Sequence, residues 1–480
     1  MTEHHPRIAS LKTPAALRER LAALGVDLPC DDATESGEES PLAQPLLLGP
    51  GRDGPLESPN RFVIQPMEGW DGTTDGRPSE LTARRWRNFG RSGAGWIWGG
   101  EAVAVRADGR ANPNQLLLDE STVDSLASLR TSLLDGARER DRPEPVVGLQ
   151  LTHSGRWSRP DGSARPRTAH RHPVLDGRVA ATESSVLSDD EVGELIEAFG
   201  HAARLASDAG FSFVDVKHCH GYLLHEFLSA RTRTGAYGGA SLEARTALAR
   251  AVLEAVRTAA PGLRRCVRLS VFDLVPHHAG PDGRGTPEAH EGPSPFAFGL
   301  DETRPDRTAP SEAIDFVRSL ADLGVSWVNV TAASPYYAPH AQRPALFPPS
   351  DGYEPPEDPL VGVARLLQAA RGIKEAVPET VVVSTGWSYL QEFLPHVAQA
   401  CVRQGWFDAV GLGRMALSYP ELPADVLAGR SLGRKKICRT FSDCTTAPRN
   451  GLVSGCYPLD PFYRGRPEFE ALKKEKRGNE

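Results

Sequence analysis

The sequence lacks any long hydrophobic run, because no stretch approaches the ~18 apolar residues that a membrane-spanning helix needs. Its first residues, MTEHHPRIAS, lack a basic segment followed by an apolar one, so we expect no export signal and a cytoplasmic protein. Neither sign of charge dominates, since 55 Lys and Arg against 62 Asp and Glu give a net charge of −7. Such a mildly acidic chain argues against nucleic acid or an anionic membrane as its partner.

Cysteine is scarce and odd in number, with seven residues in 480, which suits a reducing compartment better than a disulfide framework. The length suggests about three ordinary domains, although α/β barrels run beyond 250 residues as single units. Apolar residues make up 40% of the chain, enough for a sizeable core. The 46 glycines and 40 prolines predict long loops.

From Asn60 onward, short apolar runs alternate with segments of helical periodicity, the pattern of βαβ units and a parallel sheet. The apolar character of these runs fits strands that helices cover on both faces. The eight runs are Phe62–Met67, Trp96–Gly100, Val146–Leu151, Phe213–Lys217, Cys266–Val271, Trp327–Thr331, Thr380–Thr385 and Ala409–Leu412. We expect a closed (β/α)8 TIM barrel, an α/β fold, while an open sheet fits the same count.

Capping signals mark several of the intervening helices. Ser188 and Glu191 form a capping box ahead of apolar residues at helical spacing, and Ser388 with Gln391 indicates a later helix start. Residues 13–24 predict a short amphipathic helix near the N-terminus.

Three regions follow from these patterns. Residues 1–59 form an N-terminal extension whose second part, 30–59, is expected to be an extended or partly disordered cover. Residues 60–430 form the barrel, and 431–480 a C-terminal extension that contains cysteines. An aperiodic insertion at about 274–306 follows the fifth strand and should overhang the C-terminal face, where barrel chemistry sits. It is either a lid or a tolerated surface loop.

Two adjacent motifs carry most of the chemical information. Residues 214–228 read VDVKHCHGYLLHEFL and residues 231–245 read RTRTGAYGGASLEAR, so several titratable groups follow a strand end. These motifs resemble the Old Yellow Enzyme family of FMN-dependent oxidoreductases, whose members read roughly His-x-x-His-Gly-Tyr-Leu, then Arg-x-Asp-x-Tyr-Gly-Gly-Ser-x-x-Asn-Arg. The resemblance extends from about residue 60 to residue 427.

Further segments match the family in order: NRFVIQPM at 60–67, GEAVAV at 100–105, GLQLTHSGR at 148–156, VRLS at 267–270 and VGLGR at 410–414. The resemblance implies FMN at the C-terminal face of the barrel. It also implies a set of flavin-contacting residues: Pro66, Met67, Glu68, Ala102, Gln150, Arg268, Gly386, Gly413 and Arg414. Independently of the family, glycines beside a forked cation such as Arg414 suit a phosphate group.

The resemblance also implies a reaction. An FMN-dependent oxidoreductase takes reducing equivalents from NAD(P)H and reduces an activated alkene, an α,β-unsaturated carbonyl compound or acid. Hydride passes from flavin N5 to the β-carbon, and Tyr222 protonates the α-carbon, a role for which a phenol that is protonated at pH 7 is suited. His220 matches the second His of the family pair, which holds the carbonyl of the substrate. His218 and His225 fall between motif positions and are expected to be structural.

Two residues depart from the family pattern. Lys217 stands where the family has its first His, and a cation there favours an anionic small-molecule substrate, unless Lys217 pairs internally with Asp215 or Glu226. Glu68 follows the Pro-Met pair where many members have Thr, Cys or Ala. Its carboxylate either faces the flavin or turns outward to Arg84 or Arg85.

The C-terminal cysteines Cys438, Cys444 and Cys456 resemble the cluster segment of larger relatives such as 2,4-dienoyl-CoA reductase and trimethylamine dehydrogenase. Phe441 stands at the second ligand position. Because a [4Fe–4S] cluster uses four thiolates, we expect the cluster to be lost and no metal to be bound.

Two other functions fit the same residues. An FMN-dependent amine dehydrogenase would keep the flavin contacts, and a catalytically silent flavin-binding protein would keep them without turnover. The oligomeric state is left open, a homo-oligomer included.

Overall fold

A computed structural model describes residues 5–50, 54–289, 296–304 and 307–478 of the chain. Its centre is a barrel of eight parallel strands: β3 (Phe62–Ile64), β4 (Trp96–Ile97), β6 (Val146–Thr152), β7 (Phe213–His218), β8 (Arg264–Ser270), β11 (Trp327–Thr331), β12 (Val381–Ser384) and β13 (Ala409–Leu412). Each strand pairs with the next in this order, and β13 pairs with β3, so the sheet closes. The predicted (β/α)8 barrel is confirmed, with all eight strands where the sequence indicates them. A ninth strand, β5 (Ala102–Ala104), extends the pairing of β6.

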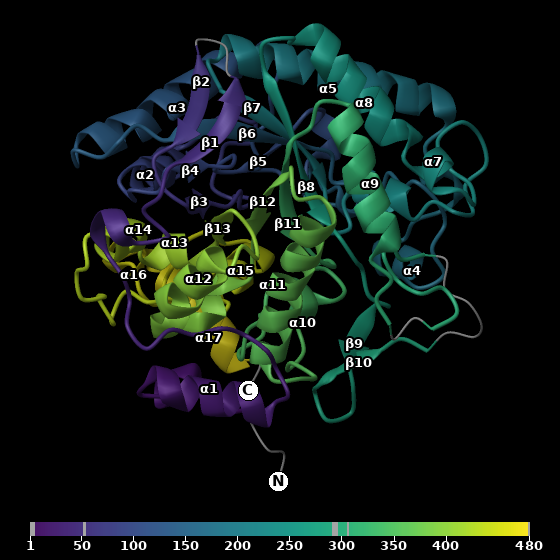
Figure 1. Cartoon of the computed structure of the whole chain (residues 1–480). Coiled ribbons are helices and arrows are strands. Elements are labelled where there is room, and N and C mark those ends of the chain that lie inside the picture. Colours follow the sequence, from purple (N-terminus) through teal and green to yellow (C-terminus); the bar gives the residue numbers. More distant parts are fainter. Residues whose placement is uncertain (1–4, 51–53, 290–295, 305–306, 479–480) are drawn as a thin grey trace.

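Helices surround the barrel on its outer side (Figure 1). The longer ones are α2 (Glu80–Gly90), α3 (Val123–Arg138), α5 (Asp189–Asp208), α8 (Ala247–Ala259), α9 (Ser311–Asp322), α11 (Pro359–Ala376) and α12 (Leu394–Arg403). Shorter ones are α4 (Leu175–Val179), α6 (Leu223–Leu228), α7 (Leu242–Arg245), α10 (Pro339–Gln342), α13 (Arg414–Ser418) and α14 (Leu422–Leu427). Helix α5 begins at the predicted capping box, in which the Ser188 hydroxyl accepts from the Glu191 backbone N–H at 3.2 Å.

The expectation that Ser388 caps a helix is wrong. Ser388 lies within a 3₁₀ segment, Trp387–Phe393, and helix α12 begins only at Leu394. The Ser388 hydroxyl instead accepts a hydrogen bond from the backbone N–H of Met415 at 3.1 Å. It therefore joins the ends of two neighbouring barrel strands rather than starting a helix.

Aromatic side chains fill the barrel at the N-terminal ends of its strands. The ring of Trp96 packs against those of Trp98, Phe213 and Trp327, with centroids 4.9 to 5.9 Å apart. These residues are almost fully buried, and pairs at this spacing stabilise a core beyond the area they bury. The end of the barrel away from the site is thus closed.

The N-terminal extension contains helix α1 (Pro14–Ala23), as predicted, and an antiparallel hairpin of β1 (Leu46–Pro50) and β2 (Pro55–Ser58). The expectation of an irregular cover over 30–59 misses this hairpin. Leu48 packs into the aromatic cluster, and its carbonyl accepts from the Trp327 indole N–H at 2.9 Å. The hairpin therefore covers the closed end of the barrel.

The insertion after β8 forms a second small hairpin, β9 (His277–Ala279) with β10 (Gly285–Pro287). It lies at the opposite end of the molecule from β1 and β2 (Figure 1). Residues 290–295 and 305–306 of the predicted insertion lie outside the described residues. The choice between a lid and a surface loop stays a prediction.

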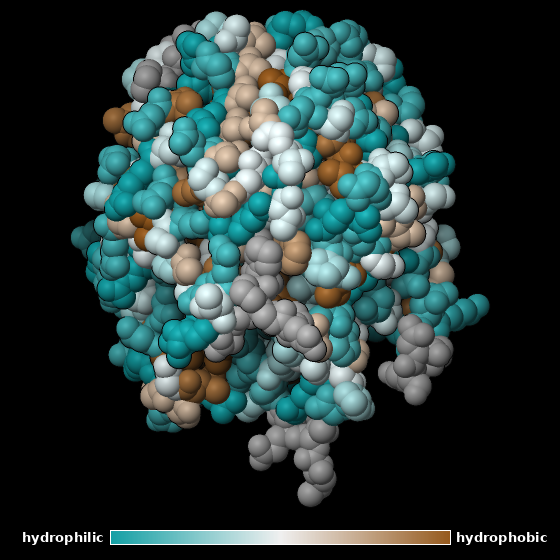
Figure 2. Space-filling model, turned by 90° about the vertical axis from the view of Figure 1, so that its right-hand side faces the viewer, coloured by the Kyte–Doolittle hydropathy of each residue, from teal (hydrophilic) through white to brown (hydrophobic). Residues whose placement is uncertain are grey.

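The C-terminal extension follows the barrel as helices α15 (Asp443–Arg449), α16 (Pro461–Arg464) and α17 (Pro467–Gly478). They have a small core of their own around Tyr457, Tyr463 and Leu472. Among the described helices, none is both long and apolar enough to cross a membrane. The face in Figure 2 is mainly hydrophilic, with hydrophobic residues in small separate patches.

Candidate active site

A cavity of about 300 Å³ opens at the C-terminal ends of the barrel strands. Ten of the twelve predicted site residues line it: Pro66, Met67, Glu68, Lys217, His220, Tyr222, Arg268, Gly386, Gly413 and Arg414. Ala102 and Gln150 do not line it. The structure therefore brings most of the predicted residues to one place, although they come from the ends of five different strands, β3, β7, β8, β12 and β13.

The turn after β7 positions two of these side chains. His220 and Gly221 both have positive φ, 67° and 73°, a conformation that is uncommon for His. A Cβ on Gly221 would lie 2.9 Å from the Tyr337 ring, so this position requires glycine. The Ser270 hydroxyl accepts from the His220 backbone N–H at 3.1 Å, and the Ser334 hydroxyl donates to its carbonyl at 2.8 Å. The tight turn brings Tyr222 back over the mouth of the barrel.

The side chain of His220 stays neutral in this position. Burial lowers its pKa well below 6.5, and the positive charges of Arg268 and Lys217 act in the same direction. Its Nε2 atom lies 3.3 Å from the Thr331 hydroxyl and 3.2 Å from the Gln342 amide nitrogen. A neutral imidazole here can offer one N–H or one lone pair to a ligand.

Tyr222 is the centre of a polar cluster. Its hydroxyl donates to a carboxylate oxygen of Glu68 and lies 3.0 Å from the hydroxyl of Tyr336. The ammonium of Lys217 lies over the Tyr222 ring, 3.6 Å from its centre. The ring of Tyr336 is in turn stacked on Trp157 at 4.4 Å. Cation, phenol and carboxylate thus meet on one side of the cavity.

The two open questions about Lys217 and Glu68 have structural answers. The carboxylate of Glu226 pairs with Arg156, and Asp215 accepts hydrogen bonds from other groups, so neither is bonded to Lys217. Glu68 faces the cavity, where Asn112 donates to its other oxygen at 3.3 Å. Loss of water around the carboxylate raises the pKa of Glu68, while Lys217 opposes the shift.

The arginines to which Glu68 could have turned are engaged elsewhere. Arg84 pairs with Asp460 at 2.9 Å. Arg85 bridges two buried carboxylates, Asp71 at 2.7 Å and Glu101 at 2.8 Å.

Gln150 does not line the cavity and is hydrogen-bonded to Asp215. The Gln150 amide donates to the Asp215 carboxylate at 2.6 Å. Trp98 Nε1 and the Arg268 backbone N–H also donate to this carboxylate. Burial raises the pKa of Asp215 to about 6, and these three donors oppose the shift. Gln65 lines the cavity instead, so a flavin contact by Gln150 or by Ala102 stays a prediction.

The other side of the cavity is positively charged. Arg268 donates to the Pro66 carbonyl at 3.2 Å, and Arg414 donates to the Pro344 carbonyl at 2.9 Å. Among the described residues, Arg268 Nε, Arg414 Nη1 and Arg343 Nη2 are buried and have no hydrogen-bond partner. A Cβ on Gly413 would meet nothing within 4 Å, so space is open beside these donors. Unpaired buried cations next to open space are suited to an anionic ligand.

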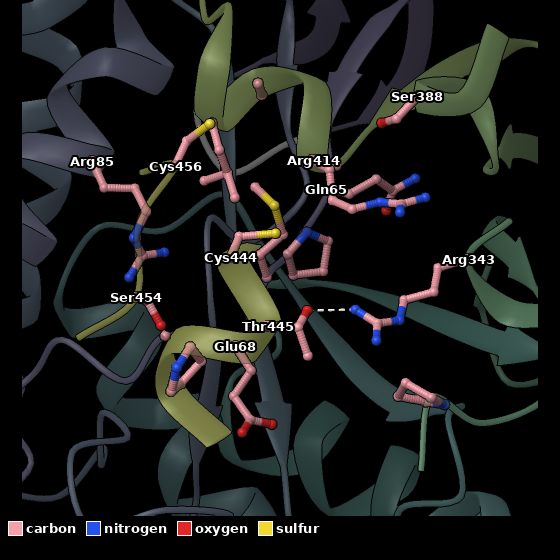
Figure 3. Close-up of a pocket in the computed structure, with 18 of the residues that line it drawn as sticks. Gln65, Glu68, Arg85, Arg343, Ser388, Arg414, Cys444, Thr445, Ser454 and Cys456 are labelled. Atoms are coloured by element: carbon pink, nitrogen blue, oxygen red, sulfur yellow. Dashed lines mark hydrogen bonds between the residues drawn. The ribbon is translucent and has the colours of Figure 1, made fainter. Parts of the chain in front are cut away.

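The C-terminal extension forms part of the cavity wall. Figure 3 shows helix α15, which carries Cys444 and Thr445, between Arg85 on one side and Arg343 on the other. Thr445 accepts a hydrogen bond from Arg343, and the Ser454 hydroxyl accepts from the Trp70 backbone N–H at 2.9 Å. The extension thus closes over the strand ends.

Several residues of the site do not follow from the sequence patterns. They are Gln65, Asn112, Tyr336, Gln342, Arg343 and Thr445. Tyr336, Gln342 and Arg343 follow strand β11, and the loop after a predicted strand is the one signal that could have found them. Asn112 also lies in the loop after a predicted strand, β4, but further along the chain, whereas Thr445 approaches from a segment without such a signal.

The three C-terminal cysteines border a second, smaller cavity of about 20 Å³, together with Phe441. In the described part of the chain, no group of His, Cys, Asp or Glu side chains is arranged to hold a metal ion. Three thiols cannot supply the four thiolates of a [4Fe–4S] cluster. Loss of the cluster stays a prediction.

Fold and site together define a (β/α)8 barrel with a cavity at its C-terminal face that is lined by Arg268, Arg343 and Arg414. The model of the NADH:flavin oxidoreductase / NADH oxidase family matches residues 49–281. This match covers just under half of the chain, and it confirms the resemblance to the Old Yellow Enzymes.

Two relatives of known name show how far the similarity extends. A metal reductase of Desulforamulus reducens is 25% identical over 388 residues, which are 80% of this chain and 49% of the relative. An NADPH dehydrogenase of Halalkalibacterium halodurans is 32% identical over 206 residues, 42% of this chain and 56% of the relative. The chain thus spans about half the length of these two proteins.

Three solved structures share the fold. A complex of 2-naphthoyl-CoA reductase has a TM-score of 0.66 at 18% identity, covering 89% of this chain and 58% of that one. Histamine dehydrogenase from Rhizobium sp. 4-9 has a TM-score of 0.61 at 21% identity, covering 88% and 52%. An Old Yellow Enzyme homologue from Zymomonas mobilis has a TM-score of 0.54 at 21% identity, covering 82% and 93%. At these identities the likeness concerns the fold alone.

Proposed function

We propose that this protein is an FMN-dependent oxidoreductase that uses NAD(P)H to reduce an activated alkene, an α,β-unsaturated carbonyl compound or acid. One observation carries the proposal: the cavity that contains the unpaired nitrogen atoms of Arg268 and Arg414 also contains Tyr222 and Lys217. An anion-binding end and a proton-donating end therefore share one space. The NAD(P)H requirement suits a cytoplasmic protein.

The residues present fit the flavin. Arg414 Nη1, beside the open space at Gly413, is suited to a phosphate oxygen, and Gly386 also lines this part of the cavity. Arg268 Nε, unpaired among the described residues, is suited to the electron-rich edge of the ring system. Pro66 and Met67 would lie along the ring. When bound, the flavin takes a hydride from NAD(P)H and passes it to the β-carbon of the alkene.

The polar cluster supplies the remaining functions. Tyr222 would donate its proton to the α-carbon, since an ordinary phenol is protonated at neutral pH. His220, held neutral by burial, would donate a hydrogen bond to the carbonyl of the substrate and so polarise the alkene. Lys217 would attract a carboxylate to the same place. Holding these groups beside the flavin is the main catalytic contribution of the protein.

The charge of the cavity favours an anionic substrate over an amine. Lys217, Arg268, Arg343 and Arg414 line it, and Glu68 opposes them. A protonated amine would approach these cations against electrostatic repulsion, whereas a carboxylate would be attracted. This balance supports alkene reduction over the oxidation of amines.

The test uses the full chain, purified and reconstituted with FMN. Anaerobic stopped-flow spectroscopy follows bleaching of the flavin by NADH, NADPH and a panel of amines, then its reoxidation by matched neutral and carboxylated alkenes. We expect NADH or NADPH to bleach it and an alkene to restore the colour. In Tyr222→Phe, bleaching should change less than about threefold, while reoxidation slows by about 10²- to 10⁴-fold.

Each other outcome overturns the proposal in its own way. A protein that stays colourless with added FMN refutes flavin binding. Bleaching by amines but not by NAD(P)H supports amine dehydrogenation instead. A flavin that every donor leaves oxidised indicates a silent flavin-binding protein.

A further inference from the structure

Glu68 and Tyr222 are joined directly in the wall of the cavity. The Tyr222 hydroxyl donates to one oxygen of the Glu68 carboxylate, and Asn112 donates to the other at 3.3 Å. Glu68 comes from the loop after β3 and Tyr222 from the loop after β7, so the contact is made across the mouth of the barrel. The carboxylate is thus the immediate partner of the group that would donate the proton.

We propose that Glu68 is a positioning residue that stores a proton and passes it to Tyr222 after Tyr222 has protonated the substrate. The inference rests on the proposed function and adds a second proton carrier to it. It assigns Glu68 a role in proton delivery, whereas the sequence suggests for this residue only contact with the flavin.

The proton moves in two steps, from Tyr222 to the substrate and then from Glu68 to Tyr222. The O–H bond of Tyr222 breaks as a C–H bond forms at the α-carbon of the alkene, whose β-carbon receives the hydride that NAD(P)H supplies. The O–H bond of the Glu68 carboxylic acid then breaks as the O–H bond of Tyr222 forms again. Glu68 remains as a carboxylate, and water returns its proton before the next turnover.

The charges around the pair explain why two protons are needed. If Glu68 is already ionised, loss of the Tyr222 proton places phenolate and carboxylate in contact, and like charges at hydrogen-bond distance cannot both be stable. The ammonium of Lys217, 3.6 Å from the ring centre, offsets one negative charge but not two. With Glu68 protonated, the same transfer leaves a single negative charge beside Lys217.

The groups that face Glu68 come from several elements. Loss of water raises the pKa of Glu68, while Lys217 of β7 and hydrogen bonds from Asn112 and Trp70 oppose the shift. Tyr336, after β11, contacts Tyr222, and burial and Glu68 raise its pKa well above 10. The remaining charges near Tyr336 are Arg159, Arg343 and Arg449. None of these groups is a second carboxylic acid.

The decisive measurement is the rate of the alkene step against pH. Reduced holoenzyme is mixed with 2-cyclohexenone, a neutral enone that does not titrate, between pH 5 and 10. We expect the wild-type rate to fall at least tenfold as pH rises, because ionised Glu68 cannot supply its proton. In Glu68→Gln the rate should be about tenfold lower at pH 6 and flat across the range. Glu39→Gln, an exposed glutamate, should behave as wild type.

A double variant separates proton storage from an effect on the flavin. Because Glu68 acts through Tyr222, Glu68→Gln should cause no further loss in a Tyr222→Phe background. An equal loss in both backgrounds overturns the inference. If Glu68→Gln does not fold, Glu68→Ala serves: formate should restore its rate, and failure of formate to do so also overturns the inference.

The failure of this inference differs from that of the proposed function. If no alkene reoxidises the wild-type enzyme at any pH, the proposed function fails. If the alkene step is fast but its pH profile is flat and is shared by Glu68→Gln, only the proton store is refuted.

Discussion

The ammonium of Lys217 lies over the face of the Tyr222 ring, 3.6 Å from its centre. Both residues are almost fully buried, and they are five positions apart on the strand end and turn that form the cavity wall. A cation on an aromatic face is stabilised by roughly 0.5 to 2 kcal/mol, more where water is excluded. Burial lowers the pKa of Lys217, because loss of water disfavours the ammonium, while the negative charge of Glu68 opposes the shift.

Replacing Lys217 by Met should change substrate preference. The uncharged side chain fills similar space but offers nothing to a carboxylate, so kcat/KM for a carboxylated alkene should fall about 10- to 100-fold, the loss of one charge-assisted contact. For the matched neutral enone we expect a fall of less than about threefold. Lys435→Met, at an exposed lysine, is the control. Equal losses for both substrates, or a wild-type preference for the neutral enone, would contradict an anionic substrate.

Arg343 should contribute to anion binding at the expense of stability. Burial and repulsion from Arg449 and Arg414 lower its pKa to about 9, and Nη2 has no partner among the described residues. A buried cation of this kind is destabilising until an anion arrives. Arg343→Met should therefore leave the melting temperature of the flavin-free protein unchanged or higher, while the affinity for an anionic ligand falls about tenfold.

Titration distinguishes the two anions that Arg343 could contact, the phosphate of FMN and the carboxylate of the substrate. If Arg343 contacts the phosphate, the Kd of FMN should rise while that of riboflavin does not. If it contacts the substrate, only KM for the carboxylated alkene should rise. Arg343→Lys keeps the positive charge, so its affinity for the anion should lie between those of wild type and Arg343→Met. A melting temperature that falls by several degrees in Arg343→Met, with no change in either affinity, would show a purely structural role.

The barrel could be predicted from the sequence because its strands are buried on both faces and therefore appear as continuous apolar runs. The β1–β2 hairpin could not, since its stability depends on distant partners. Leu48 is anchored by Trp327, which lies 279 positions away. Ser388 shows the same limit, because a residue pattern that indicates a helix cap was overridden by a hydrogen bond from Met415.

The residues of the site likewise divide into those that the sequence predicts and those that it does not. Tyr222, His220 and Arg268 lie in contiguous motifs at strand ends, so their meeting at one mouth follows from the fold. The position of Gln150 depends on the register between β6 and β7, which places it directly opposite Asp215. Neither the direction of the Glu68 carboxylate nor the approach of Thr445 is encoded locally, since each is decided by segments that meet only in three dimensions.

Asp273 should make the stability of the protein depend on pH. It follows β8, is 5% exposed, and accepts from Tyr337 at 2.5 Å and from the Leu274 backbone N–H at 2.8 Å. Burial raises its pKa to about 7, above the ordinary value of 3.8. Between these values the folded state binds a proton that the unfolded state has lost, so the stabilisation falls as pH rises through this window.

Asp273→Asn removes this titration. Relative to wild type, the variant should gain at most roughly 4 kcal/mol in free energy of unfolding between pH 4 and pH 8. Urea unfolding at both pH values measures the change. Asp282→Asn in the exposed β9–β10 turn should follow the wild type. A constant difference between Asp273→Asn and wild type across the range would mean that Asp273 has the same pKa in both states.

Gly411 in β13 and Gly413 just after it should respond differently to substitution by alanine. A Cβ on Gly411 would overlap the Gln65 amide and lie 2.6 Å from the Ser384 carbonyl oxygen, whereas a Cβ on Gly413 would meet nothing within 4 Å. Gly411→Ala should thus cost about 1 to 3 kcal/mol through overpacking and lower the melting temperature by several degrees. Gly413→Ala should keep the wild-type melting temperature without flavin but weaken FMN binding about tenfold, since its methyl group would occupy the space beside Arg414. Thermal unfolding of the flavin-free protein and fluorescence titration with FMN measure the two effects. If Gly413→Ala binds FMN as tightly as wild type, the phosphate does not lie beside Gly413, and the anion-binding end of the cavity is placed wrongly.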